Sequence, residues 1–110
     1  MALYLYQAAY KPEAWAAMIA EPGPRPEQVG QSIAAQLGGR LVGIWFAFGE
    51  YDIVGIIEAP DNVNMAAAAL KLASGGALTA AKTTPLLSIE EGVEAMQKAA
   101  SLDYSPPSTG

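Results

Sequence analysis

The sequence contains neither cysteine nor histidine among its 110 residues. Without cysteine, the chain has no disulfide, no thiol nucleophile and no thiolate ligand for zinc or an iron–sulfur cluster. Without histidine, it has no Ser-His-Asp triad, no imidazole general base and no histidine-bound haem. Any chemistry would therefore depend on carboxylates, lysine, tyrosine, backbone groups or a borrowed cofactor, and the sequence itself predicts neither a cofactor nor a metal site.

Charged residues are also scarce, at 15% of the chain, and the six lysines and arginines are outnumbered by eleven acidic residues. The cations are scattered, so no basic cluster is available to neutralise phosphates, and we expect no nucleic-acid partner. The N-terminal segment lacks the basic start and apolar core of a signal peptide, and the apolar runs are too short to span a membrane. These features predict a cytoplasmic protein without a membrane partner.

Hydrophobic residues, in contrast, make up 52% of this short chain. A chain of this length forms a single domain, and a small domain has too much surface to hide that many apolar side chains. We therefore expect a second copy of the chain to cover part of the surface, most simply in a homodimer.

Apolar patterning predicts four strands, at residues 2–10, 40–48, 52–59 and 78–87. Helices are predicted over 12–20 and 26–37, separated by a proline-rich insert, because proline cannot continue a hydrogen-bonded turn. A further helix is expected between an Asp61 N-cap and Gly75-Gly76, and a last helix after the capping box Ser88–Glu91. Residues 49–51 are short enough for a hairpin turn.

The resulting order, βαββαβ plus a C-terminal helix, predicts an α+β, ferredoxin-like fold with both main helices on one face of an antiparallel sheet. Within the strand 40–48, alternation places Leu41 and Trp45 on one face and Val42, Ile44, Phe46 and Phe48 on the other. The last helix can cover only part of the free sheet face, so we expect sheet-against-sheet packing between subunits. The domain is predicted to span 1–102, followed by a flexible tail at 103–110.

The segment Gly49-Glu50-Tyr51-Asp52 resembles the signature of the GYD-domain family. The flanking segments 37–41 and 53–61 extend the resemblance over about a quarter of the chain. The resemblance implies a ferredoxin-like fold of the dimeric α/β-barrel group, in which one sheet face is buried against a partner, and it implies little about activity. The chain departs from the family's pattern in its proline-split first helix and in a fourth strand that lacks the arginine often found there. If family members bind an anion through that arginine, only Lys82 is left nearby, which argues against such binding here.

The motif residues Gly49, Tyr51 and Asp52 allow two interpretations. In the structural one, Gly49 adopts a positive φ, Asp52 caps turn amides and Tyr51 packs against neighbouring backbone. In the functional one, Tyr51 and Asp52 form a proton-handling pair at the mouth of a pocket.

Four further residues are candidates for a site. Tyr6 and Trp45 belong to a set of aromatics that either line a cavity between helices and sheet or simply fill the core or an interface. Glu58 would act as a general base if it were buried, and otherwise lies at the surface. Lys82 either pairs with Glu50, Asp52 or Glu58 across the sheet or protects a sheet edge against aggregation.

Three functional hypotheses follow. The first is a homo-oligomeric small domain that packs through its sheet face and binds a small apolar or aromatic molecule. The alternative is a cofactor-independent enzyme of the oxygenase or isomerase type, acting in a helix–sheet cavity. A third is an interaction module that recruits a partner through its proline-rich insert or tail. The size and polarity of the cavity should discriminate between the first two.

Overall fold

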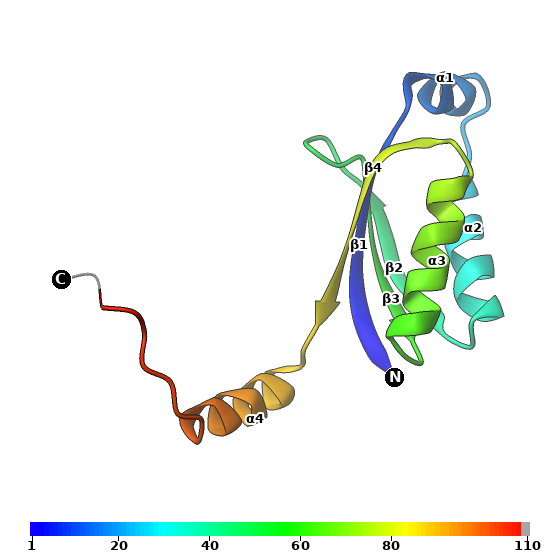
Figure 1. The fold of residues 1–110 in the computed structure, drawn as a ribbon. Helices are drawn as coiled ribbons and strands as arrows, with labels where there is room; N and C mark the ends of the chain where they lie inside the picture. Colours follow the sequence, from blue (N-terminus) through cyan, green and yellow to red (C-terminus); the bar gives the residue numbers. More distant parts are fainter. Residues whose placement is uncertain (109–110) are drawn as a thin grey trace.

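The computed structural model describes residues 1–108 and confirms the predicted α+β, ferredoxin-like arrangement. Four strands form one antiparallel sheet in the order β2-β3-β1-β4, and Figure 1 shows helices α2 and α3 side by side on one face of it. The elements are β1 (Ala2–Tyr10), α1 (Pro12–Ala20), α2 (Arg25–Gln36), β2 (Arg40–Phe46), β3 (Ile53–Ala59), α3 (Asn62–Ser74), β4 (Leu78–Leu86) and α4 (Ile89–Ala100).

The predicted helix ends are confirmed by their hydrogen bonds and backbone angles. Gly38 and Gly76 follow α2 and α3 with φ of 78°, a left-handed conformation that glycine adopts without steric cost. Asp61 accepts a hydrogen bond from the amide of Asn64 at 2.9 Å, and Ser88 forms the capping box of α4. Local sequence therefore determines where the helices begin and end.

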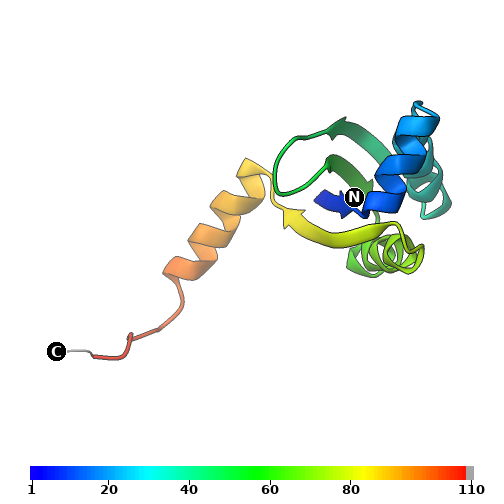
Figure 2. The ribbon, with the colours of Figure 1, turned by 90° about the horizontal axis from the view of Figure 1, so that it is seen from above.

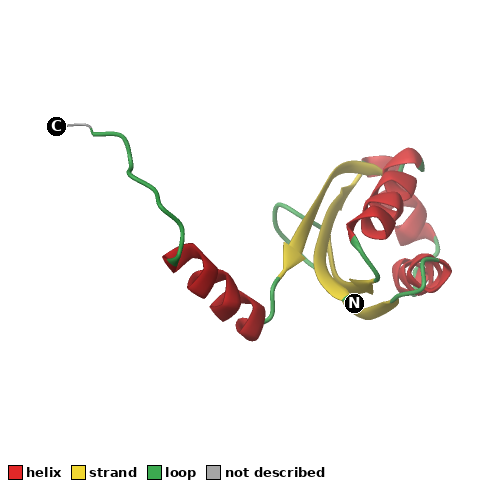
Figure 3. Cartoon of the chain, turned by 60° about the horizontal axis from the view of Figure 1, so that its bottom comes forward, coloured by secondary structure: helices red, strands yellow, loops and turns green. Residues whose placement is uncertain are grey.

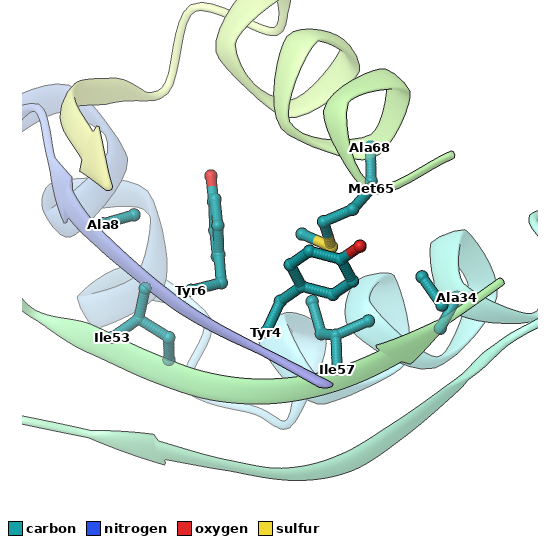
Figure 4. Packing of buried hydrophobic residues seen from close by; sticks show 9 residues of the cluster. Tyr4, Tyr6, Ala8, Ala34, Ile53, Ile57, Met65 and Ala68 are labelled. Carbon is teal, nitrogen blue, oxygen red and sulfur yellow. The ribbon is translucent and has the colours of Figure 1, made fainter. Parts of the chain in front are cut away.

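The core lies between the sheet and the helices α2 and α3. Strand alternation directs every second side chain of β1 and β3 toward the helices, and these residues are the buried ones. Figure 4 shows them meeting side chains from α2 and α3. The buried cluster comprises Tyr4, Tyr6, Ala8, Ala34, Ile53, Ile57, Ala59, Met65 and Ala68.

A register shift in β2, between Leu41 and Gly43, changes which side chains share a face. Leu41 pairs with Ile57 on the helix side, whereas Trp45 pairs with Val54 on the opposite side. The prediction that Leu41 and Trp45 share a face was therefore wrong. An irregularity of this kind adds a residue, and simple alternation does not reveal it.

The other sheet face, called the outer face here, carries an apolar centre: Leu3, Leu5, Trp45, Val54, Ile56 and Leu86. Figures 1 and 2 show that α4 extends away from the sheet and does not fold over this face. The loop 47–52 projects on the same side, opposite α2 and α3. The radius of gyration is accordingly 17.8 Å, compared with about 13 Å for a compact chain of this length.

Residues 103–108 follow α4 without regular secondary structure, as Figure 3 shows. The flexibility of the tail 103–110 stays a prediction, and its last two residues lie outside the described part of the chain.

Candidate functional site

A cavity of about 580 Å³ lies between the helix side of the sheet and helices α1, α2 and α3. It exists because small residues line it where larger ones would fill the space, among them Ala8, Gly30, Gly55, Gly75 and Ala77. Its other walls are mostly apolar. Apolar walls with a few polar groups are typical of small-molecule sites.

Two of these glycines have different roles. A Cβ on Gly30 of α2 would lie 3.2 Å from a methyl group of Leu41, so this glycine permits close approach of α2 to β2. A Cβ on Gly55 of β3 would meet its nearest atom at 3.6 Å, an ordinary contact distance. A Cβ would therefore fit at Gly55 in ordinary contact with Ile44 and Leu41, and Gly55 lines the cavity.

Tyr6 is the buried polar residue of the cavity wall, with only 7% of its surface exposed. Its hydroxyl oxygen is closed off from water and has no hydrogen-bond partner. Burial, and to a lesser extent the neighbouring Tyr10, raises the pKa of Tyr6. Tyr4, two residues earlier on the same strand, instead donates its hydroxyl to Oδ1 of Asn62 at 2.6 Å. Figure 4 shows both rings standing on the helix side of β1.

Tyr10 also lines the cavity, next to α1. Its ring packs edge-on against that of Trp15, with centroids 5.4 Å apart. Burial first, and then the nearby carboxylate of Asp52, raises the pKa of Tyr10. Both tyrosines therefore stay neutral well above physiological pH and act at neutral pH as hydrogen-bonding groups.

The charged residues that line the cavity are exposed to solvent. Glu21 follows α1, Arg25 begins α2 and Lys71 lies on α3, and all three are exposed. The charge at the cavity therefore lies on solvent-exposed side chains, whereas Tyr6 in the wall is buried.

Asp52 lies outside the cavity wall, and its role is visible in its hydrogen bonds. Its Oδ2 accepts from the backbone amide of Tyr10 at 2.9 Å and from Nε1 of Trp15 at 3.3 Å. Its backbone amide donates to the carbonyl of Ala8 at 2.8 Å. The carboxylate thus ties the β2–β3 connection to the end of β1 and the start of α1.

The other two motif residues also lie outside the wall of the cavity. Gly49 is exposed, a Cβ added to it would meet no heavy atom within 4 Å, and it is not among the glycines with positive φ. The prediction of a positive φ at Gly49 was therefore wrong. Six residues, 47–52, connect the strands rather than a tight turn, so no left-handed residue is needed. Tyr51 is half-buried beside Asp52.

Three candidate residues lie on the outer face, away from Tyr6. Trp45 is 57% exposed, and its indole lies across Gly43, where an added Cβ would come within 2.7 Å of the ring. Of the two interpretations of Trp45, the one that places it with Tyr6 in the helix–sheet cavity was wrong, because the two residues occupy opposite faces. Glu58 pairs with Arg40 across β2 and β3 at 3.2 Å.

Lys82 lies on the edge strand β4, opposite Gln7. Within residues 1–108 the ion pairs are Arg40–Glu58 and Glu94–Lys98, so of the two interpretations of Lys82 the pairing with an acid was wrong. Its protection of the sheet edge stays a prediction. No cluster of acidic residues in the described part of the chain is arranged to hold a metal ion. None of the helices within residues 1–108 has the length and hydrophobicity needed to cross a bilayer.

The family model of the GYD domain matches residues 4–96, which is most of the chain. The chain belongs to the GYD domain family. No curated protein matches this GYD domain significantly in sequence.

Solved structures resemble this GYD domain in fold at low sequence identity. MtbAldR is 15% identical with a TM-score of 0.53, and the match covers 79% of this chain. The chain spans about half of that protein, 52% of its length. A NIPSNAP domain protein from Burkholderia xenovorans is 17% identical with a TM-score of 0.49, covering 80% of this chain and 94% of its own. A NIPSNAP-like domain protein from the same organism is 15% identical with a TM-score of 0.45, covering 96% and 89%.

Sequence reasoning about this GYD domain overlooked the residues that create the cavity. The available signal was Gly55, which interrupts a run of β-branched residues where a glycine weakens a strand. Such a glycine marks a bend or a close approach, and here it leaves room for a cavity. The contribution of Tyr10 had no comparable signal, because its position depends on the register of β1 and β4.

Proposed function

We propose that this GYD domain is a homo-oligomeric binding protein that takes up a small, mostly apolar molecule in the cavity beside Tyr6. The observation that carries the binding proposal is the cavity itself, about 580 Å³ in volume and mostly apolar. Cavities of roughly 300–1,000 Å³ with a few polar groups are typical of ligand sites.

The unpartnered hydroxyl of Tyr6 favours a ligand that carries a hydrogen-bond acceptor. The hydroxyl is covered in the ligand-free structure, so a ligand acceptor would reach it after the side chains around it shift. The free energy that an unpartnered buried hydroxyl costs would then be recovered on binding. The depth of the cavity is otherwise apolar, which suits an aromatic or aliphatic body. The exposed Lys71 and Arg25 line the cavity where a polar substituent of the ligand would meet water.

Binding is favoured over catalysis by the positions of the acidic residues. Asp52 is occupied by the amide of Tyr10 and the indole of Trp15, and Glu58 lies on the outer face, paired with Arg40. The carboxylate that lines the cavity is that of Glu21, which is exposed. A general base acts within hydrogen-bond reach of the proton it removes.

A matched pair of probes tests the ligand proposal. Acetylnaphthalene and ethylnaphthalene are similar in size and differ by a carbonyl acceptor. We expect both to bind, with acetylnaphthalene losing about fivefold in affinity on Tyr6→Phe and ethylnaphthalene losing little, because one net hydrogen bond contributes about 1 kcal/mol. Equal losses for both probes would contradict a hydrogen bond from Tyr6.

A cavity-filling variant controls for the location of binding. Gly55→Val places a β-branched side chain at the cavity wall, in a strand that favours such residues. We expect it to weaken both probes at least tenfold, whereas Gly49→Ala in the exposed loop leaves both unchanged. Binding that survives Gly55→Val in a folded protein would place the ligand elsewhere and overturn the proposal.

The homo-oligomer is supported by the uncovered outer face and by the total exposed surface. The chain exposes 7,789 Å², against roughly 5,800 Å² for a compact monomer of this mass. The excess is of the size that a protein interface removes, since a typical partner contributes about 800 Å² and obligate dimers more. The apolar side chains at its centre are the kind that interfaces bury.

Sedimentation velocity on matched variants tests this part of the proposal. We expect wild-type protein to sediment as a homo-oligomer at micromolar concentration. Trp45→Glu should weaken association at least tenfold, while Val63→Glu, at an apolar and more exposed position on α3, should not. A wild-type monomer at this concentration would refute the oligomer.

A further inference from the structure

Helix α4 is an unusual element because it leaves the domain without packing against it. None of its residues is buried, and Figures 1, 2 and 3 all show it extending away from the sheet. It has only 12 residues, and isolated helices shorter than about 12–15 residues are marginal in water. The capping box and the Glu94–Lys98 pair support the helix locally, but they do not replace a packing partner.

The helix also carries an apolar stripe, defined here as Ile89, Val93 and Met96. These residues recur at helical spacing on one side, and all three are exposed, Met96 by 70%. Lys98 lies on the opposite side of the helix. An amphipathic helix of this kind becomes stable when its apolar side is covered.

We propose that α4 is an arm that crosses to a second copy of this chain, where the apolar stripe packs against the partner's outer face. This inference rests on the proposed homo-oligomer and adds the element that joins its subunits. Each chain presents both halves of the contact, an uncovered stripe and an uncovered sheet face. A two-fold pair of chains would therefore bury both halves twice.

The position of α4 favours a partner over its own sheet. Only Leu87 and Ser88 connect β4 to α4, and the side chain of Ser88 is held in the capping box that fixes the start of the helix. With this short connection, α4 points away from the outer face of its own chain (Figures 1 and 2).

The charges of α4 and of the outer face, and the exposed area of the chain, are consistent with a second copy as the partner of α4. The sequence of α4 contains three glutamates and one lysine, whereas the charged residues of the outer face are Arg40, Lys82 and Glu58. An acidic helix thus meets a face with a surplus of positive charge, which favours the encounter. The chain exposes about 2,000 Å² more than a compact monomer of this mass. This excess is above the roughly 800 Å² per partner of a standard interface and in the range of larger, obligate dimers.

A site-specific photo-cross-link tests the contact directly, because the chain has no cysteine and one introduced thiol can be labelled uniquely. Full-length Met96→Cys carrying a benzophenone maleimide is mixed with an excess of isotopically labelled wild-type chain and irradiated. We expect a product of two chains, with the link on outer-face residues of the labelled chain. Lys98→Cys, on the opposite side of the helix, should give at least fivefold less of this product.

A second measurement uses full-length charge variants. Met96→Glu and Gln97→Glu change the net charge equally at adjacent positions of α4, but only the first interrupts the apolar stripe. We expect Met96→Glu to raise the dissociation constant of the oligomer at least tenfold and Gln97→Glu to leave it within about twofold.

The two proposals fail in different ways. An intrachain link from Met96→Cys would show α4 on its own sheet and overturn the arm, as would an oligomer that forms equally well with Met96→Glu. Either result leaves the homo-oligomer standing if the wild type sediments as one. A monomeric wild type overturns both.

Discussion

Removing the hydroxyl of Tyr6 tests the environment of this side chain directly, because we expect the loss of this polar group to stabilise the folded domain. Tyr6→Phe keeps the ring, which packs among buried residues, and removes an oxygen that has no hydrogen-bond partner and no access to water. A buried hydroxyl in this state costs about 1–3 kcal/mol. We therefore expect the free energy of unfolding of the ligand-free protein to rise by up to that amount.

Tyr4→Phe is the matched control, two residues away on the same strand and the same face. The hydroxyl of Tyr4 donates to Asn62 at 2.6 Å, so its removal takes away a formed bond and leaves the Asn62 oxygen without its donor. We expect this variant to lose about 0.5–1.5 kcal/mol. Removing a tyrosine hydroxyl should therefore raise the free energy of unfolding at Tyr6 and lower it at Tyr4.

Urea unfolding followed by tryptophan fluorescence measures both variants, with protein concentration held constant because association contributes to apparent stability. The expected result is a higher midpoint for Tyr6→Phe and a lower one for Tyr4→Phe, with unchanged slopes. If Tyr6→Phe lowers the midpoint as Tyr4→Phe does, the hydroxyl of Tyr6 has a partner in solution. The hydrogen-bond argument for the ligand would then fail.

Three further predictions concern the scaffold around the cavity. Gly39→Ala should lower the free energy of unfolding by about 3 kcal/mol or more, or prevent folding, because its Cβ would overlap a main-chain carbonyl oxygen of β3. Gly49→Ala, where a Cβ meets no heavy atom within 4 Å, should change the free energy of unfolding by less than about 0.5 kcal/mol. Asp52→Ala should lower the free energy of unfolding by about 2 kcal/mol and Asp52→Asn by less, because an amide oxygen can still accept both hydrogen bonds; equal losses in urea unfolding would contradict this. The pKa values of Tyr6 and Tyr10 are raised above 10.0 in the folded state, so the contribution of their neutral hydroxyls to stability should be complete below pH 10.0 and be lost as the pH rises through the folded pKa values. The urea midpoints of Tyr6→Phe and Tyr10→Phe should therefore fall less steeply with increasing pH above 10.0 than the midpoint of the wild type.

The fold was predictable because its signals are local. Glycines after α2 and α3, the Asp61 cap and the Ser88 capping box each mark a helix end within a few residues. In β1 and β3 the buried residues occur at every second position, as the regular alternation of a strand requires. In β2 the same reasoning failed after Leu41, because one extra residue reverses the face of every residue that follows.

The site was less predictable because it depends on what surrounds each side chain. The sequence named Asp52 as a candidate, but its partners, Tyr10 and Trp15, are distant in sequence, and its hydrogen bonds to them join separate elements. The sequence named Tyr6 as a residue of either a cavity or the core, but it contained no sign that the hydroxyl of Tyr6 would lack a partner. Whether this hydroxyl has a partner depends on which donors and acceptors of other elements come within hydrogen-bond distance of it, and only the tertiary structure determines that.

The sequence by itself determined the order of strands and helices, the ends of most helices, the family and an apolar surplus too large for one small domain. These follow from periodicity, capping chemistry and composition, which act over a few residues or over the whole chain. The tertiary structure alone decided the face of Trp45, the space at Gly55 and the direction of α4. The face of Trp45 depends on strand register, the space at Gly55 on the fit between packed elements, and the direction of α4 on the path of a two-residue connection. A local sequence pattern determines none of these features.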